Sequence, residues 1–189
     1  MTTKAERRAV VLMYAEMRNF TRMSEVLDPA KVLALASEFF ALAATTVGAH
    51  KGRVLSIHND ALLGIFGNAA EALQAAQDMQ RDFAPVGERW QSEYGLPAAL
   101  AHGIHIGETV FGMAGPQGAQ QFVAFGDAVS VAERLVHRAR SGEIVLSAEA
   151  HKALGGGVEA QELPPLEVGG RRPPVKIYGV VLETRLDFT

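Results

Sequence analysis

Cysteine is absent from the 189 residues of this chain. Its absence excludes a disulfide framework, a zinc site built on thiolates and catalysis by a cysteine nucleophile. A histidine zinc site is also disfavoured: His102 and His105 are three residues apart in a predicted strand, so their side chains should point to opposite faces of the sheet.

An excess of positive charge is also missing. The 18 Lys and Arg residues are outnumbered by 21 Asp and Glu residues, which gives a net charge of −3 at pH 7. A surface that binds nucleic acid needs basic side chains to neutralise phosphates. Nucleic acid is therefore not an expected partner.

Long apolar runs are missing as well. The first one, Val10 to Tyr14, is too short for the apolar region of a signal peptide. No run approaches the roughly 18 residues of a transmembrane helix. We therefore expect a cytoplasmic protein without a membrane span.

The composition that remains is ordinary for a globular domain, with 48% hydrophobic and 21% charged residues. A chain of this length can bury one well-formed core. We predict a polar leader at 1–8, one domain at 9–183 and a C-terminal tail at 184–189.

The stretch Val54 to Gly67 predicts a β-hairpin. Two apolar runs flank Asn59-Asp60, a pair that tolerates the dihedral angles of a tight turn. The carboxylate of Asp60 is thus predicted at the tip of the hairpin, where it is either a turn former or a metal ligand.

A second carboxylate, Glu16, ends the apolar run that starts at Val10 and precedes Arg18, Asn19, Phe20 and Thr21. Two carboxylates at strand ends, Glu16 and Asp60, can converge on one divalent cation, since hard oxygen ligands together with phosphates are how Mg²⁺ is usually held.

The whole chain alternates hairpins with helices, which favours an α+β fold, a mostly antiparallel sheet with helices on one face. Asp28-Pro29 is a helix start, and Pro85 is a point where the next helix can break. Predicted strands lie at 9–15, 53–66 (the hairpin), 98–106, 121–125, 143–147, 161–168 and 174–182, with a loop bounded by Gly112 and Gly115. Predicted helices begin after Asp28, Gly67-Asn68, Asp127 and Ser147.

The order of apolar strand, acid, R-x-F-T, helix, G-R-V, hairpin with Asp and F-G resembles the catalytic domain of class III nucleotidyl cyclases, the adenylate and guanylate cyclases. The resemblance runs from about Val10 to Val181 and includes Gly103–Gly115 and Phe125–Leu146. It implies a ferredoxin-like βαββαβ core with an added terminal hairpin. It also implies Mg²⁺ or Mn²⁺ as cofactor, a nucleoside triphosphate as substrate, and a homodimer with shared active sites.

The resemblance also assigns roles to residues of this chain. Glu16 and Asp60 stand at the two metal-ligand positions. The backbone of Arg18, Asn19, Phe20 and Thr21 stands where phosphates bind, with Asn19 in place of the usual glycine. On the catalytic side, Arg134 matches the arginine that stabilises the transition state, and Ser130 replaces the asparagine that orients the ribose. Glu16 is also open to a purely structural role, and Arg134 to that of a surface charge.

Three further positions depart from the family pattern. Ser56 falls where adenylate cyclases place a base-reading Lys and guanylate cyclases a Glu, and Val123 falls where a polar partner for the base is expected. The terminal phosphate-binding Lys has no clean counterpart; Gly169 or Gly170 aligns there, and Arg171 or Arg172 is a possible substitute.

Three functions are compatible with this pattern. The first is a slow cyclase that converts a nucleoside triphosphate, ATP in preference to GTP, to a 3′,5′-cyclic nucleotide and pyrophosphate in intracellular signalling. The second is an inactive cyclase-homology module that dimerises or binds nucleotide and regulates a partner. The third is a related metal-dependent phosphoryl transfer or hydrolysis, which no residue specifically favours. Asp60 and Arg134 favour the first.

Overall fold

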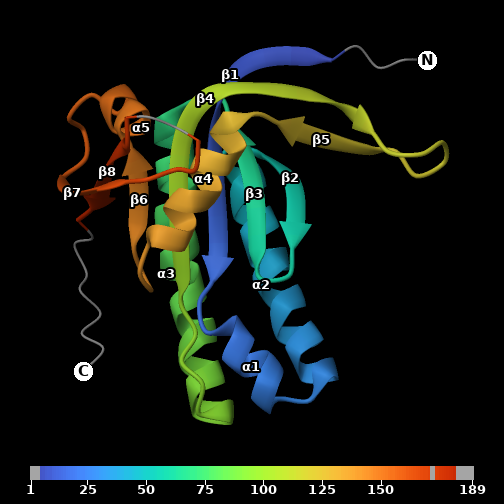
Figure 1. The fold of residues 1–189 in the computed structure, drawn as a ribbon. Helices are drawn as coiled ribbons and strands as arrows, with labels where there is room; N and C mark the ends of the chain where they lie inside the picture. Colours follow the sequence, from blue (N-terminus) through green and yellow to red (C-terminus); the bar gives the residue numbers. More distant parts are fainter. Residues whose placement is uncertain (1–4, 171–172, 182–189) are drawn as a thin grey trace.

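One mixed sheet organises the computed structural model, which describes residues 5–170 and 173–181 (Figure 1). The strands follow the order β2-β3-β1-β4-β6-β8-β7, and β5 pairs with β4. Their bounds are β1 Glu6–Met17, β2 Arg53–His58, β3 Ala61–Phe66, β4 Leu100–Ala114, β5 Gln121–Phe125, β6 Ile144–Ser147, β7 Ala160–Leu166 and β8 Val175–Val180. The helices are α1 Phe20–Val26, α2 Pro29–Ala49, α3 Ala69–Tyr94, α4 Asp127–Arg138 and α5 Ala148–Ala153.

The centre of the sheet is the antiparallel pair β1 and β4, in register from Glu6↔Phe111 to Met17↔Leu100. All other strand pairs are antiparallel except β4 with β6. The predicted α+β architecture, a βαββαβ core with a terminal hairpin of β7 and β8, is therefore confirmed.

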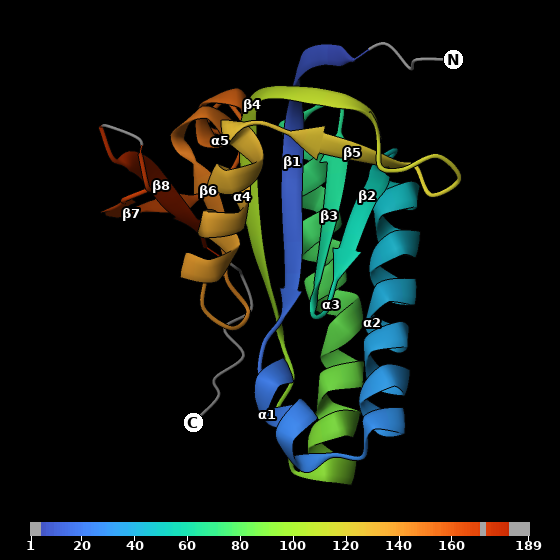
Figure 2. The same ribbon diagram turned by 45° about the vertical axis from the view of Figure 1, so that its right-hand side comes forward.

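Helices cover both faces of this sheet, so the expectation of helices on one face was wrong. The long helices α2 and α3 lie on one side and α4 on the other (Figure 2). The strand β1 shows the reason, because its apolar residues are buried on both sides. Met13 packs with the α2 and α3 core, whereas Leu12 packs with the α4 core.

Two glycines of β4 allow α4 to lie directly on the sheet. A Cβ atom at Gly103 would come 2.5 Å from the backbone nitrogen of Val136, and one at Gly107 would come 2.5 Å from the Cβ of Ala128. Both distances are shorter than real side chains tolerate. The Gly-Ile-His-Ile-Gly sequence thus keeps α4 in close contact with β4.

One turn and two helix caps formed as predicted. The hairpin turns at Asn59-Asp60. The Asp28 carboxylate accepts a hydrogen bond of 2.9 Å from the backbone N–H of Ala30, and the Ser147 hydroxyl accepts one of 3.2 Å from that of Ala150.

Four boundaries differ from the predictions. Helix α3 continues through Pro85, because Phe83 and Trp90 on either side of it are both buried in the core. Strand β4 runs to Ala114, through the expected loop start at Gly112, because it pairs with β5. Residue 127 is the first residue of α4 and Gly126 is its N-cap.

The fourth difference lies at the N-terminus. Strand β1 starts at Glu6, inside the predicted leader, because β4 extends far enough to pair with it. Residues 1–4 of that leader and the predicted tail at 184–189 lie outside the described residues.

Within the described part of the chain, α2 has the length and composition of a helix that crosses a membrane. The sequence prediction counted only unbroken apolar runs and did not anticipate this. Such helices also occur in the cores of globular domains, and α2 buries Leu35, Phe39, Ala43 and Val47 in the core that it shares with α3. The finding is therefore weak support for a span.

We predict that Gly103→Ala destabilises the fold. The new methyl group has to push α4 away from β4, and overpacking of this kind costs about 1–3 kcal/mol. Urea denaturation measures the change. Gly112→Ala on the same strand is the control, since its Cβ would meet its nearest atom at 3.9 Å. Equal stability of the two variants would contradict the close packing.

We also predict a pH dependence of stability from His102. Its ring is buried against α3, its Nδ1 lies 3.1 Å from the Nε2 of Gln80, and burial lowers its pKa to about 3. Between about pH 6.5 and 3, unfolding lets this ring take up a proton, so stability falls as the pH falls through that window.

Replacement of His102 by a side chain that does not titrate removes this proton uptake on unfolding. His102→Gln should therefore show a smaller loss of unfolding free energy between pH 7 and pH 5 than the unmodified protein, measured by urea denaturation at each pH. His58→Gln, at an exposed ring, is the control. An unchanged pH slope in His102→Gln would show that another group is responsible.

Candidate functional site

The hairpin brings Asp60 beside Glu16. Glu16 of β1 pairs with Ala61 of β3, and the backbone N–H of Met17 donates a 2.8 Å hydrogen bond to the carbonyl of Asp60. Asn59 takes the left-handed conformation, with φ 42°, that a tight turn requires. The turn therefore places both predicted acids at the same end of neighbouring strands.

Glu16 and Asp60 line one cavity of about 230 Å³. Sequence reasoning missed three polar side chains of its wall, Tyr14, Glu133 and His137. The remaining wall residues are His58, Asn59, Ala61 and Val136. Glu133 and His137 are four residues apart on an amphipathic helix, which is a signal of a shared polar face. The strand that this face meets is not visible in the sequence.

The Glu16 carboxylate is nearly buried, with 10% of its side chain exposed, and it is already paired. Its Oε1 accepts a hydrogen bond from the guanidinium of Arg18, and its Oε2 lies 3.3 Å from the Nε2 of His137. Arg18 also donates to the backbone carbonyls of Val136 and Ala139 at the end of α4. Its guanidinium therefore joins an acid of β1 to the C-terminus of α4.

Charge and burial act in opposite directions on Arg18. Burial lowers its pKa, and the nearby carboxylates of Asp60 and Glu143 raise it. Tyr14 in the same cavity has its pKa raised to about 12, mainly by burial and secondarily by the charge of Glu133. Tyr14 thus stays a neutral phenol at physiological pH and cannot serve as a base there.

Ser130 and Arg134 lie on α4 but outside this cavity. Both are exposed and one turn apart, on the side of the helix away from the buried Val131 and Leu135. Within one chain, the structure does not bring them to Glu16 and Asp60.

The segment predicted to bind phosphates, Arg18 to Thr21, forms the turn after β1 and the first two residues of α1. Asn19 is in the left-handed conformation, with φ 70°, that glycine adopts most easily, and its Nδ2 donates a 2.8 Å hydrogen bond to the carbonyl of Pro97. Asn19 therefore holds a glycine-like backbone, and its side chain fixes the turn.

The predicted base-reading positions lie apart from the acids. Ser56 is on β2, at an irregularity in its pairing with β3, and Val123 is on β5. The guanidinium of Arg53 stacks over the Phe122 ring at 4.7 Å and joins these two strands. Arg171 and Arg172 lie outside the described residues.

The described residues contain no group of three or more His, Cys, Asp or Glu side chains placed to hold a metal ion. The two carboxylates are the right type of donor for Mg²⁺ or Mn²⁺. Asp60 is available for such a role at the turn, and Glu16 fits only when Arg18 releases it.

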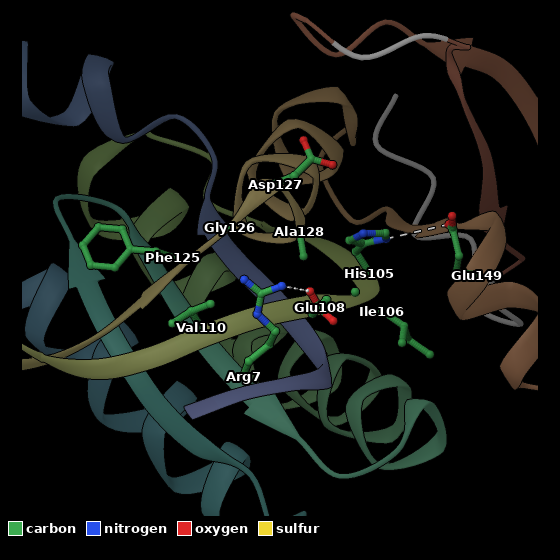
Figure 3. Close-up of a pocket in the computed structure, with 11 residues that line it drawn as sticks. Arg7, His105, Ile106, Glu108, Val110, Phe125, Gly126, Asp127, Ala128 and Glu149 are labelled. Atoms are coloured by element: carbon green, nitrogen blue, oxygen red, sulfur yellow. Dashed lines mark hydrogen bonds and ion pairs between the residues drawn. The ribbon is translucent and has the colours of Figure 1, made fainter. Parts of the chain in front are cut away.

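A second cavity, of about 330 Å³, opens between β1, β4, α4 and α5 (Figure 3). Glu108 there forms a 3.0 Å ion pair with Arg7, and the Nδ1 of the buried His105 lies 3.8 Å from an oxygen of Glu149. His105 thus faces α4 and α5 while His102 faces α3, as the odd spacing predicted. None of the predicted site residues lines this second cavity.

Comparison with known proteins identifies relatives over nearly the whole chain. The family described as adenylate and guanylate cyclase catalytic domain matches residues 2–182. Adenylate cyclase 1 of Rhizobium meliloti (strain 1021) is 30% identical over 186 residues, which are 94% of this chain and 28% of that protein. The chain thus spans less than a third of the length of that relative.

Solved structures agree with the fold. The adenylyl cyclase CyaB from P. aeruginosa superposes with a TM-score of 0.89 at 21% identity, over 98% of this chain and 100% of that one. The guanylyl cyclase Cya2 superposes with a TM-score of 0.87 at 26% identity, over 95% and 94%. With a family match over almost every residue, this chain belongs to the adenylate and guanylate cyclase catalytic domains.

Proposed function

We propose that this domain converts a nucleoside triphosphate, preferably ATP, into a 3′,5′-cyclic nucleotide and pyrophosphate. The observation that carries the proposal is the meeting of Glu16 and Asp60 in one cavity at the end of β1 and the β2–β3 hairpin. These are the two positions at which the family resemblance expects metal ligands. The name of the adenylate cyclase relative supports ATP over GTP.

In this reaction the ribose 3′-hydroxyl loses its proton and attacks the α-phosphorus, and pyrophosphate leaves. A bound divalent cation supplies Lewis-acid stabilisation of the attacking and leaving oxygens. Asp60 and, once released from Arg18, Glu16 are the residues that hold it. Arg134 stabilises negative charge on the phosphates, and Ser130 donates a hydrogen bond to the ribose.

These two pairs of residues belong to different chains in the proposed assembly. Ser130 and Arg134 are exposed on α4 and do not line the cavity of Glu16 and Asp60. A symmetric homodimer places Ser130 and Arg134 of one protomer at the cavity of the other, and creates two equivalent sites.

The base is selected by contacts that differ from those the family pattern leads us to expect. Ser56 and Val123 are both short and uncharged, so a purine meets one hydroxyl and an apolar wall. Loss of one preorganised hydrogen-bond donor typically costs about 10²- to 10³-fold in rate. We therefore propose a slow enzyme with weak discrimination between ATP and GTP.

The alternative is a regulatory cyclase-homology module. The pairing of Glu16 with Arg18 and His137 favours it, because this acid has no free oxygen for a cation in the present arrangement. A cytoplasmic location and the domain bounds 9–183 remain predictions under either function.

We predict that the protein, incubated with Mn²⁺ and ATP, forms cyclic AMP detectable by mass spectrometry, and that Asp60→Asn lowers the rate at least about 100-fold. The amide keeps the shape of the turn but removes the charge that holds the cation. Asp82→Asn, at an exposed position on α3, is the matched control.

Light scattering on the same samples reports the assembly. A folded dimer that forms no cyclic nucleotide from ATP or GTP contradicts the enzymatic proposal and leaves the regulatory module. A protein that stays monomeric at tens of micromolar, with and without nucleotide, contradicts the shared site.

We further predict that Ser130→Asn raises the rate of cyclic nucleotide formation about tenfold, which corresponds to about 1.4 kcal/mol of transition-state stabilisation. Asparagine reaches further than serine and offers a stronger pair of donors to the ribose. Stability should change by less than about 1 kcal/mol, since the site is exposed. Arg134→Ala in the same background should remove the gain.

Ser92→Asn, an equivalent change on the exposed surface of α3, controls for a general effect of the substitution. If Ser130→Asn leaves the rate of a folded dimer unchanged, residue 130 does not contact the ribose.

A further inference from the structure

Arg18 occupies the place of a cation at the predicted metal site. Its guanidinium contacts the Oε1 of Glu16, and the electrostatic influence of Asp60 reaches it as well. A nearly buried carboxylate such as Glu16 needs a positive partner, since an unpaired buried charge is costly. Arg18 supplies that partner from within the chain.

The same guanidinium is anchored at a second element. It donates to the carbonyls of Val136 and Ala139 at the C-terminal end of α4, where carbonyls lack the regular helical partners. The Val136 carbonyl also accepts a 3.2 Å hydrogen bond from the backbone N–H of Ala139. Cations are favoured at this end of a helix by the helix dipole. The planar fork of arginine suits this arrangement, because several donors reach one carboxylate and two carbonyls at once.

A divalent cation and this guanidinium compete for Glu16. One oxygen of Glu16 is taken by Arg18 and the other lies 3.3 Å from His137. Arg18 does not line the cavity, but its guanidinium holds the Oε1 of Glu16. Two positive groups on one carboxylate oxygen repel each other, so coordination through Oε1 requires Arg18 to release Glu16. When Arg18 leaves, its hydrogen bonds to the end of α4 are lost or rearranged as well.

We propose that Arg18 is an internal counter-ion that blocks cation binding by Glu16. Cation binding is thereby coupled to the hydrogen bonds that Arg18 makes at the C-terminal end of α4. The proposal rests on the proposed use of Glu16 and Asp60 as cation ligands. In the absence of nucleotide, the affinity of the site for a divalent cation then depends on how easily Arg18 is displaced from Glu16. Because the same helix α4 also carries Ser130 and Arg134, binding of the cation loosens the C-terminal end of the helix on which both side chains lie.

The test is direct binding of Mn²⁺ to the whole chain without nucleotide, followed by the electron paramagnetic resonance signal of free Mn²⁺. Arg18→Met keeps the length of the side chain and removes its charge, so Mn²⁺ affinity should rise about tenfold or more. Arg22→Met, an exposed arginine four residues further along, should bind as the unmodified protein does. Glu16→Gln combined with Arg18→Met should lose the gain.

Hydrogen exchange on the unmodified protein gives a second measurement that does not depend on a variant folding. Saturating Mn²⁺ should speed the exchange of backbone amides at 139–143, which follow the carbonyls that Arg18 holds. Equal Mn²⁺ affinity of Arg18→Met and the unmodified protein overturns the proposal. So does unchanged exchange at 139–143 when Mn²⁺ is bound.

The outcomes separate this proposal from the enzymatic one. Tighter Mn²⁺ binding by Arg18→Met without any cyclic nucleotide supports the counter-ion and contradicts the enzyme. Cyclic nucleotide formation that depends on Asp60, with Mn²⁺ affinity indifferent to Arg18, supports the enzyme and overturns the counter-ion.

Discussion

The arrangement of the site depends on the contact of α4 with the two central strands. Gly103 and Gly107 remove the side chains that would separate this helix from β4. The backbone of the helix therefore approaches the sheet, and its polar side reaches β1, so that Glu133 and His137 share a cavity with Glu16. A helix held further from the sheet would leave the carbonyls of Val136 and Ala139 out of reach of Arg18.

Electrostatics at this cavity are a balance of opposite charges. Glu16, Asp60 and Glu133 contribute negative charge to the cavity. The guanidinium of Arg18 in the same chain partly offsets this charge through its contact with Glu16. The buried acid Glu16 is therefore paired within the chain and needs no bound cation to offset its charge. Under the proposed function, Glu16 has to exchange this positive partner for a cation before it can act as a ligand.

The positions that differ from the family pattern have structural consequences of different kinds. Asn19 reproduces the backbone that a glycine would adopt there and fixes it through Pro97. Ser56 and Val123, by contrast, remove functional groups without a visible replacement among the described residues. The departures therefore leave the fold intact, and those at Ser56 and Val123 fall at positions that the family resemblance assigns to the nucleotide base.

Much of this molecule follows from local sequence. The Asn59-Asp60 turn, the caps at Asp28 and Ser147, and the acids at the ends of apolar strands all depend on neighbouring residues, so their signals lie within a few positions of one another. The convergence of Glu16 and Asp60 was expected from the order of the motifs and the family resemblance, because the pairing of β1 with β3 that produces it joins strands that are distant in sequence.

The tertiary structure alone decided which groups surround those acids. Arg18 meets Val136 and Ala139 across 118 and 121 positions of sequence, and His137 reaches Glu16 only because α4 lies on the second face of the sheet. Burial of β1 on both faces and of the helix around Pro85 likewise depends on distant partners. Local sequence determined where the carboxylates are, and long-range packing determined that one of them is already neutralised.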